Sequence, residues 1–328
     1  MIDLHMHLNG SLSAEIVIKL AKKHKIDLPT YDEEELKKLI SVPLDCDSLN
    51  EYLKCTKLPR LVTQTKEGIT DAVFMLLDEL KKQGLIYAEI RLAPQRHRDN
   101  GLSQEEVVLA AIEGLKKSKL KAKLILCCMR GNGLEQENLE TINLAKKYID
   151  GGVGGVDLAG AEALFKTEDY REIFECAKKL GVPITIHAGE ADGPESVIDA
   201  INMGATRIGH GIRAIYDKAL VKKIIAENII LEMCPSSNFQ TKAVLSKEEY
   251  PLRKFLDLGV KVTLNTDNKT ISSTNLSDEF AFAQKELGLK ESEKIVLYKN
   301  AIEASFTNKR EKQELYKLLE SALKVKQI

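Results

Sequence analysis

Short β-rich segments alternate with helical segments along most of this 328-residue sequence. Helical periodicity is clearest at 107–117 and 172–180, where apolar residues recur at i, i+3 and i+4 with charged residues between them. A repeated strand–helix–strand order predicts parallel pairing with right-handed crossovers. Eight β-rich segments in one chain of this length favour a single TIM-type (β/α)₈ barrel of the α/β class, with an open doubly wound sheet as the alternative. The β-rich segments are 2–8, 86–92, 123–129, 153–158, 183–186, 207–209, 229–233 and 261–264.

The interval after the first β-rich segment is much longer than the others. It contains two helical stretches, about 13–25 and 48–83, with a break near Pro43. In a barrel this helical insertion, about residues 9–85, would follow the first strand at the ligand-binding end, where long segments often act as lids. From residue 277 onward the sequence predicts extra C-terminal helices. No linker divides the chain, so we expect residues 1–328 to form one barrel domain.

Composition excludes several classes of protein. The chain has 48 Lys and Arg against 49 Asp and Glu, which opposes binding to nucleic acid, because that requires a surplus of basic side chains. A hydrophobic content of 44% excludes a disordered chain. No apolar run approaches the ~18 residues that a membrane span needs, and no secretory signal opens the sequence. The cysteines are dispersed, and we interpret them as reduced thiols, which are typical of cytosolic proteins. We therefore expect a cytoplasmic protein without a membrane partner.

Four of the six histidines fall at or just after expected strand ends. His5 and His7 are two residues apart, so both imidazoles project to the same side of the first strand. His187 and His210 follow two later strands, and Asp267 adds a carboxylate after the last one. Because the C-terminal strand ends form the active face of a β/α barrel, we expect these five side chains to lie near one another.

Three imidazoles and one carboxylate suit Zn²⁺, which keeps an open position for water in catalytic sites. The predicted ligands are His5, His7, His187 and Asp267. This assignment leaves His210 and Glu190 as unliganded acid or base groups beside the metal. An accidental group of core or surface histidines is the alternative.

Seven motifs, spread over nearly the whole chain, resemble the adenosine deaminase family in order and spacing. They are HMHLNGS at 5–11, YAEIR at 87–91, DLAG at 157–160, HAGE at 187–190, RIGHG at 207–211, CPSSN at 234–238 and NTDN at 265–268. The resemblance implies a catalytic barrel with one zinc ion per chain. It also implies that the partners are small-molecule nucleosides. Adenosine and 2′-deoxyadenosine would be converted to the corresponding inosine and ammonia, in purine salvage.

The chemistry of such a reaction assigns roles to the remaining polar groups. The resemblance implies attack of a zinc-bound hydroxide on purine C6, because zinc lowers the pKa of bound water to about 7. Glu190 would donate a proton to purine N1, which requires a carboxyl pKa raised by burial. His210 would orient the hydroxide and take up its proton, while Asp267 would also accept a hydrogen bond from the water.

Substrate contacts follow from the same resemblance. Gly160 would donate its backbone N–H to purine N3, and His7 would contact the substrate as well. Asn268 replaces an Asp found in many members, and its amide can donate to purine N7 without a proton requirement. Asn9 also replaces an Asp and would face the ribose 5′-hydroxyl, where it repels a 5′-phosphate less strongly. We expect no Arg cluster near the motifs to hold a phosphate, so the nucleoside is favoured.

The insertion would supply an apolar cover over the substrate, for which Leu49, Tyr52 and Leu53 are candidates. Other substrates remain open at this point: adenine, or an N6-substituted or 5′-phosphorylated adenosine. A binuclear metal site lacks a bridging Lys at 157–160, and a Cys234 nucleophile is opposed by the proline that follows it. The non-enzymatic alternative is a catalytically inactive nucleoside-binding module. The sequence indicates no particular oligomeric state.

Overall fold

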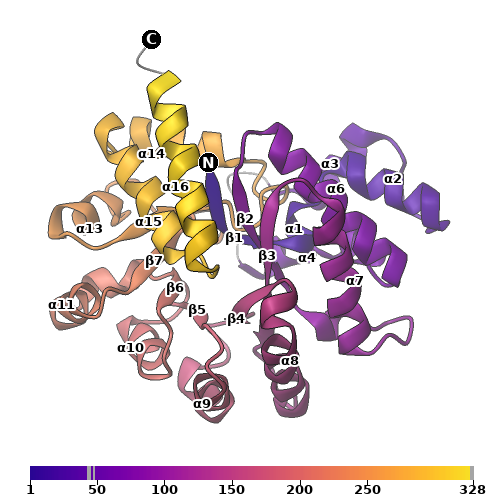
Figure 1. The fold of residues 1–328 in the computed structure, drawn as a ribbon, viewed down its shortest axis with the longest axis horizontal. Coiled ribbons are helices and arrows are strands. Elements are labelled where there is room, and N and C mark those ends of the chain that lie inside the picture. The colour runs from indigo at the N-terminus through magenta and orange to yellow at the C-terminus, as the bar shows by residue number, and fades with distance from the viewer. Residues whose placement is uncertain (43–45, 47–48, 326–328) are drawn as a thin grey trace.

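Two four-stranded parallel sheets, ordered β1-β2-β3-β4 and β5-β6-β7-β8, form the centre of the computed structural model (Figure 1). The structure describes residues 1–42, 46 and 49–325. Every strand lies within a few residues of its predicted position. The strands are β1 (Ile2–His7), β2 (Tyr87–Leu92), β3 (Lys121–Met129), β4 (Val153–Ala159), β5 (Thr185–Ala188), β6 (Arg207–His210), β7 (Ile230–Met233) and β8 (Val262–Leu264).

Two parallel bridges close these sheets into a barrel. Met6 pairs with Asp267, just after β8, and Val156 in β4 pairs with Ile184, just before β5. At the first of these seams the His7 backbone N–H donates to the Asp267 carbonyl at 2.7 Å. The predicted TIM-type barrel is therefore confirmed, and the open doubly wound sheet is wrong.

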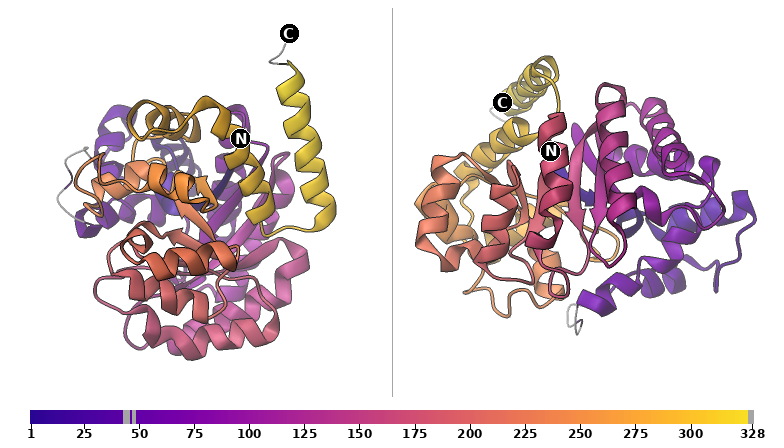
Figure 2. Two further views of the ribbon diagram at one scale, coloured as in Figure 1. Left: turned by 90° about the vertical axis from the view of Figure 1, so that its left-hand side faces the viewer. Right: turned by 90° about the horizontal axis from the view of Figure 1, so that it is seen from below.

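Helices cover the outside of the barrel between consecutive strands (Figures 1 and 2). Local sequence sets their ends: α7, for example, begins after Ser103, which forms a capping box with Glu106. The helices from β2 to β8 are α7 (Gln104–Lys117), α8 (Glu135–Tyr148), α9 (Arg171–Leu180), α10 (Pro194–Asn202), α11 (Lys218–Ala226), α12 (Pro235–Gln240) and α13 (Leu252–Leu258). Short 3₁₀ turns lie among them: η1 (Pro94–Arg96), η2 (Ile149–Gly151), η3 (Thr167–Tyr170) and η4 (Ile212–Tyr216).

The predicted helical insertion lies between β1 and β2. One expectation is wrong in detail: the stretch 48–83 is not one helix but three, α4 (Leu49–Lys54), α5 (Lys57–Leu61) and α6 (Lys66–Lys82). Thr65 explains the last division, because its side chain accepts from the Gly68 N–H at 3.0 Å and so starts a new helix. The insertion begins with α1 (Leu8–Ser11), α2 (Ala14–His24) and α3 (Glu33–Ile40). The predicted break near Pro43 falls outside the described residues.

Three extra C-terminal helices follow β8, and the last two cover the end of the barrel that is opposite the histidines. They are α14 (Leu276–Glu286), α15 (Lys294–Ala304) and α16 (Lys309–Val325), with η5 (Glu291–Glu293) between the first two. Residues of α15 and α16 form a separate apolar cluster with Ile2, Leu4 and Tyr87 at the beginnings of β1 and β2. In Figure 2, α16 runs along the outside of the molecule. Within the described part of the chain, no helix has the length and apolar character that crossing a bilayer requires.

The β4–β5 seam leaves no room for a side chain at Gly155. A Cβ there would lie 2.5 Å from the Pro183 carbonyl oxygen and 2.8 Å from the Phe306 ring. We expect Gly155→Ala to lower the free energy of unfolding by about 1–3 kcal/mol, because the backbone has to move to relieve the overlap. Gly151→Ala is the control, since its Cβ would meet only the Tyr148 ring, at 3.8 Å. Denaturant unfolding of both variants tests this, and equal stabilities would contradict it.

Candidate active site

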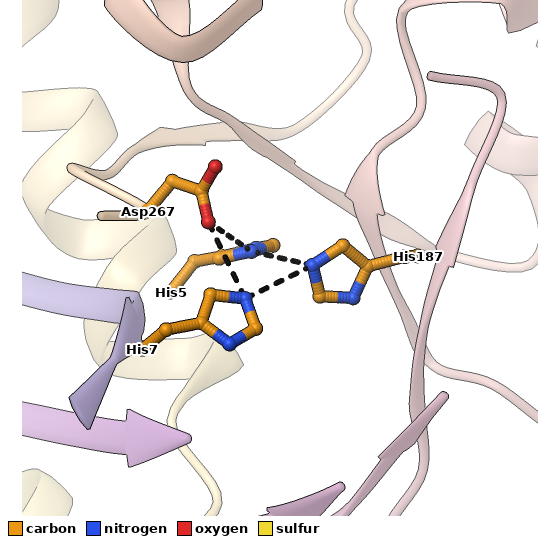
Figure 3. A group of neighbouring side chains, drawn as sticks. All are labelled: His5, His7, His187 and Asp267. Carbon is orange, nitrogen blue, oxygen red and sulfur yellow. Dashed lines mark hydrogen bonds and ion pairs between the residues drawn. The ribbon is translucent and has the colours of Figure 1, made fainter. Parts of the chain in front are cut away.

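Three imidazoles and one carboxylate meet at the C-terminal ends of the strands (Figure 3). His5 and His7 come from β1, His187 comes from β5 and Asp267 follows β8, with one possible ligand atom of each within 4.8 Å of the others. The His187 Nε2 atom lies 3.0 Å from His5 Nε2 and 3.2 Å from His7 Nε2. Asp267 Oδ1 lies 3.3 Å from His7 Nε2. The structure therefore brings together all four residues that the sequence predicted as ligands.

The spacing of these atoms fits a single metal ion. Tetrahedral ligands at the usual Zn–N distance of ~2.0–2.1 Å lie about 3.3 Å from one another, close to the observed separations. Burial lowers the pKa of His7 to about 3, so this ring is neutral and keeps the lone pair that a metal ligand needs.

Buried carboxylates contact the Nδ1 atoms of two of the imidazoles, on the opposite side of each ring from its Nε2. His5 Nδ1 lies 2.9 Å from Glu232 Oε2, and His187 Nδ1 lies 2.9 Å from Asp157 Oδ2. When Nδ1–H donates to a carboxylate, the lone pair of Nε2 faces the metal position. Burial opposes ionisation of Glu232, but the positive charges of Arg91 and Arg207 and the hydrogen bond with His5 together outweigh it and hold the pKa of this carboxyl well below its usual value.

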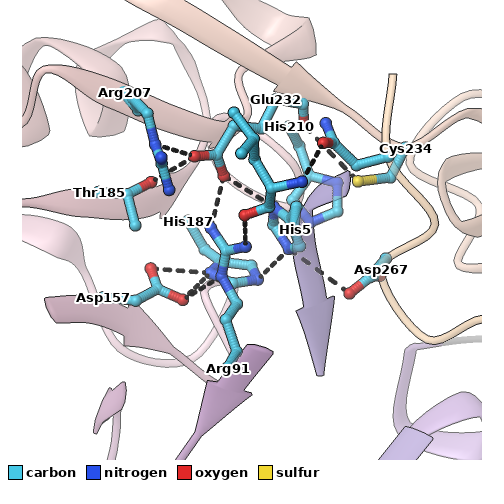
Figure 4. A network of polar contacts seen from close by, with 12 residues as sticks. His5, Arg91, Asp157, Thr185, His187, Arg207, His210, Glu232, Cys234 and Asp267 are labelled. Atoms are coloured by element: carbon cyan, nitrogen blue, oxygen red, sulfur yellow. Dashed lines mark hydrogen bonds and ion pairs between the residues drawn. The ribbon is translucent and has the colours of Figure 1, made fainter. Parts of the chain in front are cut away.

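Arg91 joins these two carboxylates (Figure 4). Its Nε donates to Asp157 Oδ2 at 3.0 Å, and its Nη2 donates to Glu232 Oε2 at 2.5 Å. Arg207 lies on the other side of Glu232, with its Nε 2.6 Å from Oε1. Arg91, Asp157 and Arg207 lie in the motifs but had no predicted role, and Glu232 was not among the predicted site residues. The available signal was the presence of charged residues inside strands that are otherwise apolar.

Two residues of the site have a left-handed backbone, Asp267 with φ of 59° and His210 with φ of 63°. This conformation costs about 1–2 kcal/mol in a residue other than glycine. At Asp267 the closing seam compensates, because its N–H donates to the His5 carbonyl and its carbonyl accepts from the His7 N–H, both at 2.7 Å. The Ser237 hydroxyl donates to Asp267 Oδ2 at 2.6 Å. The seam thus directs the carboxylate toward the imidazoles.

Glu190 and His210 lie beside the metal-ligand group. Glu190 Oε2 is 3.5 Å from His210 Nε2, and the Thr241 hydroxyl donates to Glu190 Oε1 at 3.2 Å. Burial raises the pKa of Glu190 to about 8, and the negative charge of Asp267 adds to the shift. Glu190 therefore keeps its proton at neutral pH. On the far side of the His210 ring, Asn238 Nδ2 lies 3.0 Å from Nδ1.

Glu162 positions the loop that carries Glu190, a role that no sequence pattern predicted. Its buried carboxylate accepts backbone N–H groups from four consecutive residues, 189–192, at 2.6–3.3 Å. It also accepts from the Ser196 hydroxyl at 2.5 Å. One side chain thus satisfies a whole turn of backbone donors, and this fixes where the Glu190 side chain begins.

A cavity of about 510 Å³ extends from the metal-ligand group. Its lining includes the substrate-contact candidates Asn9, Gly160 and Asn268. Tyr52 and Leu53 also line it, whereas the side chain of Leu49 lies outside the described residues. The volume falls within the range of small-molecule sites, about 300–1,000 Å³.

The cavity also has basic side chains that lie outside the motifs. Lys57, Arg60 and Arg96 all line it. Lys57 and Arg60 belong to α5 in the insertion, while Arg96 belongs to η1 after β2. Only the fold brings these two segments together, and no spacing along the chain predicts that they share the cavity.

Comparisons with known proteins agree with this architecture. The family model described as adenosine deaminase matches residues 1–322. An adenosine deaminase of Haemophilus ducreyi is 49% identical over 322 residues, which are 96% of this chain and 94% of that protein. Adenine deaminase from Arthrobacter aurescens is 26% identical, with a TM-score of 0.86 and coverage of 98% of both chains. The N6-methyl-AMP deaminase from Arabidopsis thaliana is 26% identical, with a TM-score of 0.84 and coverage of 98% of this chain and 96% of that one.

The carboxylates behind the imidazoles make a testable contribution to metal affinity. We expect Asp157→Asn to weaken zinc binding by about 10- to 100-fold, because the neutral amide no longer polarises His187. Asp71→Asn is a matched control, since Asp71 also contacts a histidine, His24, at 3.3 Å, but far from the site. Competition with a chromogenic chelator measures both affinities. Equal zinc affinities in the two variants would contradict the assignment.

Proposed function

The chain belongs to the adenosine deaminase family, and from this premise we propose that it hydrolyses adenosine and 2′-deoxyadenosine to the corresponding inosine and ammonia in a zinc-dependent reaction. The protein is then a hydrolase acting on the C–N bond of a cyclic amidine. The observation that carries the proposal is the position of a carboxyl group protonated at neutral pH, Glu190, beside a metal-ligand group in one cavity.

His5, His7, His187 and Asp267 would hold one zinc ion per chain. When bound, zinc supplies a Lewis acid that lowers the pKa of a coordinated water to about 7. Asp157 and Glu232 keep two of the rings oriented for this role by accepting from Nδ1.

Glu190 supplies the acid of the reaction. Addition of a water oxygen to purine C6 moves electrons onto N1, and a proton at N1 neutralises the charge that develops there. The protonated Glu190 carboxyl donates that proton, because burial keeps it protonated at neutral pH.

His210 orients the attacking oxygen. The Asn238 amide donates to Nδ1 of this neutral ring, so the ring hydrogen resides on Nε2, on the side that faces Glu190. Nε2–H therefore donates to the oxygen before the reaction. Of the two protons that the water loses, one reaches the amino nitrogen, which leaves as ammonia, and the other restores the Glu190 carboxyl.

The remaining side chains of the cavity select the purine nucleoside. Gly160 donates its backbone N–H to purine N3, Asn268 donates to N7, and Asn9 faces the ribose 5′-hydroxyl, with His7 against the sugar. In this structure Asn268 Nδ2 donates to Asp267 Oδ1 at 2.8 Å, which leaves its second amide hydrogen for the base. Residues 9–85 act as the lid of one catalytic domain, with Tyr52 and Leu53 facing the cavity.

Glu190→Gln tests the acid directly. The amide keeps the size of the side chain but cannot donate an acidic proton, so we expect kcat for adenosine to fall by about 10²–10⁴-fold. The affinity for inosine should change by only a few-fold. The ultraviolet change from adenosine to inosine measures turnover, and calorimetry measures inosine binding. Turnover within a few-fold of the natural protein would contradict the role of Glu190.

The pH dependence of kcat gives a second test. Because the pKa of Glu190 is raised to about 8, its donating form persists through neutral pH and is lost above that value. We therefore expect kcat to decline as the pH rises through about 8. Thr241→Val is a useful comparison, because it removes a hydrogen bond that favours the ionised carboxylate. It should move the decline to higher pH, and a shift to lower pH would be inconsistent with the assignment.

A further inference from the structure

A network of buried polar side chains joins the loop of residues 189–192, which carries Glu190, to the strand of a metal-ligand residue. All four of its members have 3% or less of their surface exposed: Arg130, Thr167, Ser196 and Glu162. Arg130 Nη2 donates to the Thr167 hydroxyl at 2.9 Å, and the Thr167 and Ser196 hydroxyl oxygens lie 2.7 Å apart. The Ser196 hydroxyl donates to Glu162 Oε1 at 2.5 Å. We refer to these side chains as the Arg130–Glu162 network.

The two ends of the network bind neighbouring parts of one short segment. At one end, Arg130 Nη2 also donates to the His187 carbonyl at 2.7 Å. At the other end, Glu162 accepts the N–H groups of residues 189–192. His187 belongs to the metal-ligand group, and Glu190 follows it by three residues. The network therefore fixes the backbone of the acid relative to the backbone of a metal-ligand residue.

Both hydroxyl hydrogens of the network are directed toward Glu162. Because the Ser196 O–H donates to Glu162, the Ser196 oxygen accepts from the Thr167 O–H, and the Thr167 oxygen accepts from Arg130. The Glu162 carboxylate thus accepts five hydrogen bonds, four from backbone N–H groups and one from Ser196. Hydrogen bonds to an ionised acceptor are stronger than those between neutral groups, and burial strengthens them further.

Glu162 also brings a negative charge close to Glu190. The titratable groups that face Glu190 are Asp267, His187, His210, Glu162 and Tyr250. The negative charges of Asp267 and Glu162 both raise the pKa of Glu190, in addition to the larger effect of burial. Asp267 belongs to the metal-ligand group, where a bound cation would offset its charge. No such role falls to Glu162, so its charge continues to act on Glu190 when a metal is bound.

We propose that Glu162 is a positioning residue for the acid of the reaction, which holds the Glu190 backbone in place and by its charge keeps the Glu190 carboxyl in the proton-donating form. Glu162 is not among the residues that line the cavity, so it acts through Glu190 and not on the purine. Arg130 supports it from the other end of the network. This inference rests on the proposed function, because that function makes Glu190 the acid.

Two substitutions at Glu162 separate its charge from its reach. Glu162→Gln keeps the length of the side chain but removes the charge. Loss of a neighbouring negative charge lowers the pKa of Glu190, so the decline of kcat should move to lower pH by about one pH unit. Glu162→Asp keeps the charge but is one methylene shorter. It should leave the pH of the decline unchanged while kcat falls by about 10- to 100-fold, because the loop that carries the acid is displaced.

Ser196→Ala is the matched control. It removes one hydrogen bond from the same carboxylate without changing the charge of the network, so the decline of kcat should stay at its natural pH. Zinc affinity, measured by competition with a chromogenic chelator, should remain within about threefold in all three variants, because none of these side chains is a metal ligand. A general loss of structure would instead weaken zinc binding and leave no ordered difference among the variants.

Infrared spectroscopy of the zinc-loaded full chain reports the proton on Glu190 without turnover. The absorption of a protonated carboxyl that is absent from Glu190→Gln belongs to Glu190. The pH at which this absorption disappears should be lower in Glu162→Gln than in the natural protein. In Glu162→Asp and Ser196→Ala it should equal the natural value.

Each outcome bears on one proposal. If the Glu190 absorption of Glu162→Gln disappears at the natural pH, Glu162 does not control the proton and the inference is overturned. Natural kcat in Glu162→Asp overturns it as well, and this holds even if Glu162→Gln does not fold. Absence of adenosine turnover in the natural zinc-loaded protein overturns the proposed function, while the infrared titration still decides whether Glu162 holds the proton on Glu190.

Discussion

The ion pairs of Arg91 with Asp157 and Glu232 are the contacts on which the rest of the site depends. All three side chains are fully buried, and each carboxylate holds one imidazole of the metal-ligand group by its Nδ1. Removal of one member of such a network typically costs about 3–5 kcal/mol, because a buried charge is left without a partner. A buried network of charges is stable only when every member has its partner. This network therefore joins β2, β4 and β7 in a fixed geometry around the histidines.

The metal-ligand group also depends on closure of the barrel. His5 and His7 belong to the first strand and Asp267 follows the last, so these ligands meet only where the two ends of the barrel pair. The same seam stabilises the left-handed backbone of Asp267. At the opposite end of the strands, α15 and α16 cover the apolar beginnings of β1 and β2. The N-terminal ends of the strands therefore carry an apolar packing cluster, and the C-terminal ends carry the metal-ligand group, as is usual for this fold.

Much of this arrangement could be predicted from local patterns. The strands have regular apolar runs, and His5 and His7 share one face through their spacing of two residues, so the fold and the four ligand candidates were accessible. Contacts between distant segments were not. Arg91, Asp157 and Glu232 come from three strands, and Gln64 joins Arg60 to Arg96 by backbone contacts that no sequence spacing reveals. The break that divides α5 from α6 depends on the Thr65 cap, which the apolar pattern of the segment does not predict.

The most direct test of the account is metal removal and restoration during hydrolysis of adenosine. The zinc-loaded protein should release one ammonia for each inosine formed. Dialysis against a chelator should abolish the reaction, and one equivalent of zinc per chain should restore it, because His5, His7, His187 and Asp267 form a single site. Turnover that persists in protein shown by elemental analysis to be free of metal would contradict the account, as would the absence of turnover in protein that contains one zinc per chain.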